Sequence, residues 1–281
     1  DVISTVFFII KKGYRSLNMY VWGLRQLVHH VLNKRPKNYY LYLFHDSTIE
    51  ETRHDDPELN KMVSTEIKDI LNMLKHHDRV FLFRYNFPQF RDDKYPFYHI
   101  HTFGTIIRFL PLFDFKEFTH LKTVTVLDID VVKVLKRKPD KFETQFKMIE
   151  KTPHVPVYFS SYVCYDVLYW SRVKRLDNLT FLRMIANFVG NRIRFPHYLF
   201  DTFVDKLGKG TAIFPEDQEN MEYYVSLLYS DTIHGSKKFF FGYDEYFLDA
   251  YVLPWMLESH VNFIANLTGK DDLDRSVKSI F

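Results

Sequence analysis

Cysteine is nearly absent from this chain, because Cys164 is the only one among its 281 residues. A single thiol excludes an intramolecular disulfide and any cysteine-rich zinc site. It also fits a reducing compartment, where most proteins carry no disulfides. Long apolar runs are missing as well. No stretch of about 18 consecutive apolar residues occurs, so the sequence predicts no membrane-spanning helix.

An excess of charge of one sign is also missing. The 38 lysines and arginines are balanced by 35 acidic residues, which leaves a formal net charge of +3. A chain so balanced, without a basic stripe interleaved with aromatic residues, does not predict nucleic-acid binding.

The signatures of three common enzyme classes do not occur. No Gly-x-Gly-x-x-Gly follows the first expected strand, and no P-loop pattern of the Gly-Lys-Ser/Thr type is present. A dinucleotide-binding or P-loop site is therefore not expected. Gly-x-Ser-x-Gly is absent too, which argues against the usual nucleophile elbow of hydrolases.

The first part of the chain alternates apolar strands with amphipathic helices. Residues 6–10, 40–44 and 80–85 are apolar runs typical of buried strands, and helical spacing of apolar residues follows each of the first two. This alternation predicts right-handed βαβ units. The expected fold class is therefore α/β, with a central, mostly parallel mixed sheet flanked by helices.

The second part is less regular. We expect a strand at residues 157–161, a helix at 179–189 and an aromatic-rich helix or loop pair at 195–207. No internal repeat or low-complexity linker separates the two parts. The chain is thus expected to form one domain with two lobes, residues 1–132 and residues 133–281.

Residues 123–132 are the stretch on which the functional prediction depends. Their apolar, β-branched residues predict a short buried strand with Asp128 and Asp130 at its carboxyl end. Alternate residues of an extended chain point the same way, so both carboxylates can reach one target. Hard divalent cations prefer oxygen ligands, and open α/β sheets bind ligands beyond the carboxyl ends of their strands. An ordinary solvated turn is the alternative, because Asp-x-Asp is common.

A helix is expected at residues 99–112, directly before this strand. Gly104 and Arg108 share one stripe of it, beside the buried face. Gly104 is a position where another group can approach closely. Arg108 could face the same crevice as the two aspartates, and a surface arginine is the alternative.

These segments resemble the nucleotide-sugar-dependent glycosyltransferases of the GT-A fold, and most closely the family 8-like enzymes. The resemblance rests on Arg108 with its trailing Pro111, followed after 20 positions by the first aspartate of Leu-Asp-x-Asp at residues 127–130. Residues 242–249 resemble the later segment that opens a helix beside the acceptor site in that family. The likeness covers the first lobe and this short segment.

The resemblance implies a metal-dependent transfer of a sugar to a hydroxyl of a glycan or glycoprotein acceptor, with a UDP-sugar as the expected donor. Asp128 and Asp130 would bind Mn²⁺ or Mg²⁺ at the donor diphosphate, and Arg108 would lie near the donor sugar or its phosphates. A divalent cation stabilises the charge that develops on a diphosphate leaving group. The planar guanidinium of an arginine suits the oxygens of such a group.

Other site residues are implied by position in this fold. Tyr14, after the first strand, could stack on the nucleoside base, and packing or surface exposure is its alternative. Asp46, at the end of the second strand, could accept from the base or the ribose. The family's third metal ligand is a histidine in a segment that this chain lacks; His260 is the expected replacement and His234 its competitor. Phosphate oxygens and water could complete the metal shell instead.

Asp244 and Glu245 raise the question of stereochemistry. In an inverting enzyme one of these carboxylates would act as general base toward the acceptor hydroxyl. In a retaining enzyme the same position more often binds acceptor or sugar hydroxyls. Helix capping without a catalytic role is the alternative for both residues. With Arg108, they form the expected catalytic group.

Two other functions stay open at this point: a sugar nucleotidyltransferase, which would release pyrophosphate, and a non-catalytic nucleotide-sugar-binding module. Two settings are also open, a cytoplasmic enzyme of viral or microbial origin and the lumenal domain of a secretory-pathway enzyme without its anchor. The sugar, the acceptor and the oligomeric state are not predicted.

Overall fold

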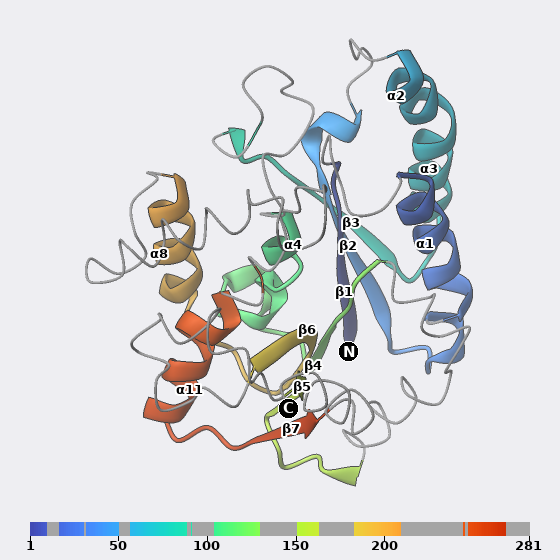
Figure 1. The fold of residues 1–281 in the computed structure, drawn as a ribbon. Helices are drawn as coiled ribbons and strands as arrows, with labels where there is room; N and C mark the ends of the chain where they lie inside the picture. Colours follow the sequence, from blue (N-terminus) through green and yellow to red (C-terminus); the bar gives the residue numbers. More distant parts are fainter. Residues whose placement is uncertain are drawn as a thin grey trace, which may run out of the picture.

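The computed structural model describes residues 1–9, 17–30, 32–50, 57–88, 91, 104–129, 151–162, 183–208, 244 and 247–267. A seven-stranded sheet forms its centre, with strand order β3-β2-β1-β4-β6-β5-β7 (Figure 1). The strands are β1 (Val2–Phe7), β2 (Tyr40–Asp46), β3 (Val80–Tyr85), β4 (Thr123–Val126), β5 (Val157–Tyr162), β6 (Arg183–Asn191) and β7 (Phe263–Leu267).

The sheet is mixed and mostly parallel. Strands β1 to β4 run parallel to one another. Strand β6 runs antiparallel to its two neighbours, β4 and β5, and β7 pairs parallel with β5. The predicted mostly parallel mixed sheet with flanking helices is therefore confirmed at this level.

Helices cover both faces of the sheet, as Figure 1 shows. Helices α1 and α3 pack on one face through an aliphatic cluster that includes Leu27 and Leu74. On the other face, α4, α8 and α11 join a cluster rich in phenylalanine. The α-helices are α1 (Leu17–His30), α2 (Pro57–Met62), α3 (Lys68–Lys75), α4 (Gly104–Ile107), α8 (His197–Gly208) and α11 (Leu253–Glu258). Short 3-10 segments are η1 (Leu32–Lys34), η2 (Ser47–Glu50), η5 (Leu110–Leu112) and η6 (Lys116–Phe118), and π-helical turns are η3 (Val63–Ile67) and η9 (Leu248–Val252).

Most of the predicted strands agree with the structure. The runs at residues 40–44, 80–85 and 157–161 correspond to β2, β3 and β5. The first strand begins earlier than predicted, at Val2 instead of residue 6. Strands from both halves of the chain enter one continuous sheet, since β5, β6 and β7 all follow residue 132. None of the helices in the described ranges is long and apolar enough to cross a membrane.

The helix predicted at residues 179–189 is wrong over residues 183–189, where the structure has strand β6; residues 179–182 lie outside the described residues. Phe188 and Val189 are adjacent in sequence, and both are completely buried. The strand lies between β4 and β5 in the sheet, and burial of two adjacent residues means that both of its faces are covered. A short apolar segment that is buried on both faces lacks the alternation of a half-exposed strand and cannot be separated from a buried helix by periodicity.

The continuous helix predicted at residues 99–112 is also corrected over residues 104–112. Helix α4 ends at Ile107, and a 3-10 turn follows at Leu110–Leu112. Pro111 has no N–H to donate to the carbonyl of Ile107, and its ring would clash with that carbonyl in an α-helix. Arg108 therefore follows the last α-helical residue instead of lying in mid-helix.

Candidate functional site

Arg108 is the centre of a buried charged cluster. Its side chain is only 2% exposed. Its Nη1 donates to Oδ1 of Asp128, and its Nη2 donates to Oδ2 of Asp244. The guanidinium carbon also lies 5.4 Å from the ring centroid of Phe109. Burial by itself lowers the pKa of Arg108, but the charges and hydrogen bonds of the two aspartates outweigh it and raise the pKa. The cluster therefore holds a permanent cation between two carboxylates.

Asp128 is the solvent-exposed member of this cluster. Strand β4 alternates, with Val124 and Val126 in the phenylalanine-rich cluster, and Asp128 continues that alternation two residues after the strand ends. Its side chain is 45% exposed. Oδ1 is bound by Arg108, and Oδ2 has no partner among the residues that the structure describes. Asp128 can thus offer one oxygen to a ligand while it remains paired.

Asp244 is the buried acidic member of the cluster. It is 6% exposed and lies 136 positions beyond Arg108 in the chain. The three motifs on which the family resemblance rests thus supply one residue each to a single point: the arginine segment, the acid-ended strand and the late acid segment. The structure brings these three predicted residues together.

Gly104 allows this arrangement through a close approach. A Cβ atom at Gly104 would meet ring atoms of Phe8 at 2.5 Å, which is far inside normal contact. Phe8 follows β1, so α4 can sit this close to the carboxyl end of β1 only because residue 104 has no side chain. The expectation that something approaches Gly104 closely is confirmed.

Gly104→Ala is expected to lower the free energy of unfolding by about 1–3 kcal/mol, the usual range for overpacking. Urea denaturation followed by circular dichroism measures it. Phe8→Leu should restore part of the loss in the double variant, and Phe8→Leu alone gives the reference. An unchanged midpoint for Gly104→Ala would contradict the close packing of α4 on β1.

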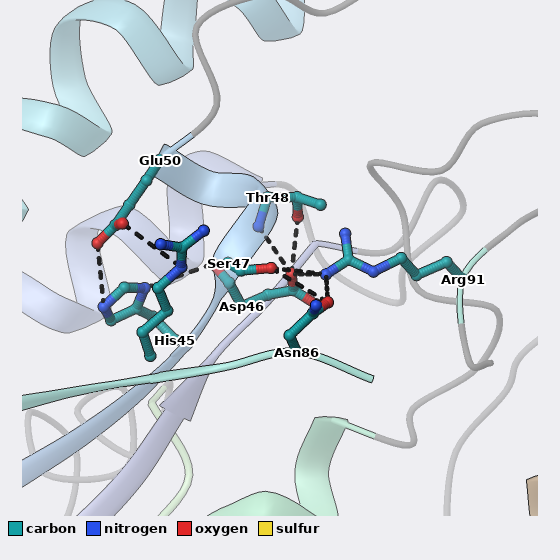
Figure 2. A network of polar contacts seen from close by, with 8 residues as sticks. His45, Asp46, Ser47, Thr48, Glu50, Asn86 and Arg91 are labelled. Atoms are coloured by element: carbon teal, nitrogen blue, oxygen red, sulfur yellow. Dashed lines mark hydrogen bonds and ion pairs between the residues drawn. The ribbon is translucent and has the colours of Figure 1, made fainter. Parts of the chain in front are cut away.

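A second polar network lies at the carboxyl end of β2 (Figure 2). Asp46 is 1% exposed, and its Oδ1 accepts from the N–H and the hydroxyl of Thr48, both at 2.9 Å. Figure 2 shows the guanidinium of Arg91 pointing at Asp46, Ser47 and Asn86, with Nη2 at 2.7, 2.8 and 2.8 Å from their oxygens. Arg91 therefore links Asp46 at the end of β2 to Asn86, which directly follows β3. Its predicted contact with the base or ribose stays a prediction, with Oδ1 already engaged.

His45 lies next to this network and is almost fully buried. Its Nε2 is 3.5 Å from Oε1 of Glu50, and Oε2 of the same residue lies 3.6 Å from Nε of Arg84. Burial is the main cause that lowers the pKa of His45, although Glu50 and Asp46 oppose it. His45 is therefore a neutral core histidine near pH 7 and not a free acid or base.

The remaining predicted residues divide into two groups. Tyr14, Asp130, Glu245 and His234 lie outside the described residues. His260 is exposed on the turn after α11, with φ of 53° and its N–H donating to the carbonyl of Leu257. Across the described ranges, no three histidine, cysteine, aspartate or glutamate side chains gather in a way that could hold a metal. His260 as third ligand stays a prediction.

Asp128 supplies one carboxylate oxygen of the kind that a divalent cation binds. Carboxylate oxygens are the ligands that Mn²⁺ and Mg²⁺ prefer. Oδ2 of Asp128 is such an oxygen, on a half-exposed side chain at the carboxyl edge of the parallel strands. Asp130, two positions on, is the residue that the sequence offers as a second ligand.

Sequence reasoning missed several residues of the two clusters. Arg91 gave no signal, because two of its partners, Asp46 and Ser47, lie 45 and 44 positions earlier in the chain. Thr48 could have been found, since Asp-x-Thr after a strand is the pattern of an Asx turn. The burial of Arg108 also gave no signal, because charged side chains are rarely fully buried and only the fold supplies their partners.

Comparison with known proteins gives little. No family model and no curated protein matches this chain. One solved structure similar to it is a CMP:2-keto-3-deoxy-manno-octonic acid synthetase in complex with CTP, with 8% sequence identity and a TM-score of 0.36 over 100% of this chain and 99% of that chain. A likeness of this size does not assign a family.

Proposed function

We propose that this protein is a metal-dependent transferase acting on a nucleoside diphosphate sugar, and specifically a glycosyltransferase of the GT-A type with a UDP-sugar donor. The observation that carries the proposal is the buried Arg108 between Asp128 and Asp244. The family resemblance requires these three motifs to converge, although they are far apart in sequence. An unrelated turn at Asp128 would have no reason to share a buried arginine with Asp244.

The donor diphosphate is assigned to the carboxyl edge of β4. There Oδ2 of Asp128, together with Asp130, would hold Mn²⁺ or Mg²⁺, which when bound stabilises negative charge on a leaving diphosphate. Nε of Arg108 is buried without a partner among the described residues. A buried donor of this kind usually has a partner, and an oxygen of the donor substrate would supply one.

Arg108 would act mainly by holding Asp128 in place. Two of its nitrogens bind carboxylates, so the side chain cannot swing toward the substrate without breaking a buried ion pair. A carboxylate that is fixed before the ligand arrives loses less conformational freedom on binding. The arginine is thus proposed as a rigid support whose Nε is still available to donate to the substrate.

Asp244 is proposed as a partner of Arg108 and not as the general base. An adjacent guanidinium stabilises the deprotonated carboxylate and makes it a poor proton acceptor. If transfer proceeds with inversion, Glu245 is the better candidate for taking the proton of the acceptor hydroxyl. If it proceeds with retention, neither acid is needed as base.

Calorimetric titration tests the proposal. UDP is expected to bind in Mn²⁺ and to bind much more weakly in EDTA, with GDP as the comparison nucleotide. Incubation with UDP-sugars should then release UDP.

A second assay tests the alternative, a sugar nucleotidyltransferase. It incubates the protein with CTP and a sugar and measures the release of pyrophosphate. Pyrophosphate release from CTP or UTP with a sugar would favour that alternative over glycosyl transfer. Binding of UDP without any turnover would favour a non-catalytic module. If no nucleotide binds to the folded protein in Mn²⁺, the proposed function is wrong.

A further inference from the structure

Ser4 is a polar residue at the centre of a buried apolar strand. It lies in β1, is completely buried, and pairs with Val126 of β4 on one side and Tyr42 of β2 on the other. A buried hydroxyl destabilises a protein unless it forms a hydrogen bond. The hydroxyl of Ser4 donates to the backbone carbonyl of Arg108 at 2.6 Å.

The carbonyl of Arg108 directly follows the last residue of helix α4. Helix α4 ends at Ile107, and the last carbonyls of a helix have no partner within it. The Ser4 hydroxyl supplies one across 104 positions of sequence. It thereby fixes the backbone from which the Arg108 side chain starts.

Ser4 also touches the strand that carries the other half of the ion pair. Its backbone carbonyl accepts from the N–H of Leu127 at 3.0 Å, and Leu127 directly precedes Asp128. One residue therefore bonds through its side chain to Arg108 and through its main chain to the neighbour of Asp128. We propose that Ser4 is a positioning residue that sets the separation of Arg108 and Asp128. The ligand-binding part of this inference rests on the proposed function.

Thr5 offers a matched control in the same strand. It too is completely buried, but its hydroxyl has no hydrogen-bond partner in the described part of the chain. Thr5→Val keeps the shape and removes a hydroxyl that bonds to nothing described. Ser4→Ala removes the hydroxyl that holds Arg108. The pair separates loss of this bond from loss of a buried hydroxyl in general.

The first test does not depend on any ligand. In a double-mutant cycle, Ser4→Ala is compared in the wild-type and Arg108→Met backgrounds by urea denaturation. If Ser4 acts on the guanidinium, its effect on the unfolding midpoint should be at most about half as large in the Arg108→Met background. Additive effects would mean a purely structural hydrogen bond and would overturn the inference. Should Ser4→Ala fold poorly, Ser4→Cys, of similar size but a weaker donor, enters the same cycle.

The second test uses UDP with Mn²⁺. Ser4→Ala is expected to weaken binding about tenfold, which corresponds to 1.4 kcal/mol, while Thr5→Val binds like the wild type. Equal affinity for Ser4→Ala and wild type would overturn the positioning role toward this ligand. If the wild type itself binds no nucleotide, the proposed function fails, and the double-mutant cycle still decides whether Ser4 positions Arg108.

Discussion

Arg108→Met is expected to lower the free energy of unfolding by about 3–5 kcal/mol, the cost of breaking a buried ion pair from one side. Methionine fills much of the volume, so the loss reflects charge more than packing. Asp244, which is 6% exposed, would stay buried while it loses the guanidinium of Arg108. Asp128 is half-exposed and can turn to water, so it contributes less to the loss. Urea denaturation measures the effect.

Two variants make this result specific. Arg84→Met removes an arginine that is 61% exposed and lies 3.6 Å from Glu50, and surface pairs of this kind contribute about 0–1 kcal/mol. Arg108→Met combined with Asp244→Asn should recover much of the loss, because the buried negative charge is then removed together with the positive one. A small effect of Arg108→Met, or no recovery in the double variant, would contradict the buried ion pair.

Asp128→Asn is expected to weaken Mn²⁺-dependent binding of UDP by about 100-fold or more. Loss of residues that only support a metal ligand already costs 10–100-fold, and Asp128 is proposed as a ligand itself. In EDTA the difference between the variant and the wild type should nearly vanish, because the contribution of Asp128 acts through the cation. Calorimetric titration in both buffers gives the two affinities.

Asp114 provides the control for this substitution. Its side chain is 46% exposed against 45% for Asp128. It accepts from the N–H and Nδ1 of His197, at 2.7 and 2.8 Å. These hydrogen bonds act with the charge of His197 to lower the pKa of Asp114, although burial opposes them. Asp114→Asn should bind UDP like the wild type. Unchanged binding by Asp128→Asn would refute the metal role of Asp128.

The sequence predicted the strands that have clear ends and simple patterns. Strand β3 matches residue for residue, because charged and polar residues precede its apolar run and Asn86 and Pro88 follow it closely. Strand β6 could not be predicted, since its identity depends on insertion between two strands and not on its own periodicity. The neighbouring strands, and not the local sequence pattern, determine that this segment forms a strand.

The candidate site was predictable as a set of motifs but not as a set of contacts. The spacing of Arg108 and Asp128 pointed to a shared crevice, and the structure places them in contact. The burial of Arg108 and the pairing with Asp244 depend on a segment 136 positions away. Local sequence patterns carry no information on which distant carboxylate neutralises a buried cation.

The place of β6 in the sheet has a consequence for the order of assembly. Strands β1 to β4 can pair once the chain has been made up to Val126, because all their partners precede that point. Strand β5 has only β6 and β7 as neighbours, and both come later in the chain. Among the described strands, none can pair with the outer edge of β4 or with β5 until residues 183–191 arrive. On the ribosome, the outer edge of β4 therefore waits for its strand partner for as long as the intervening residues take to be synthesised.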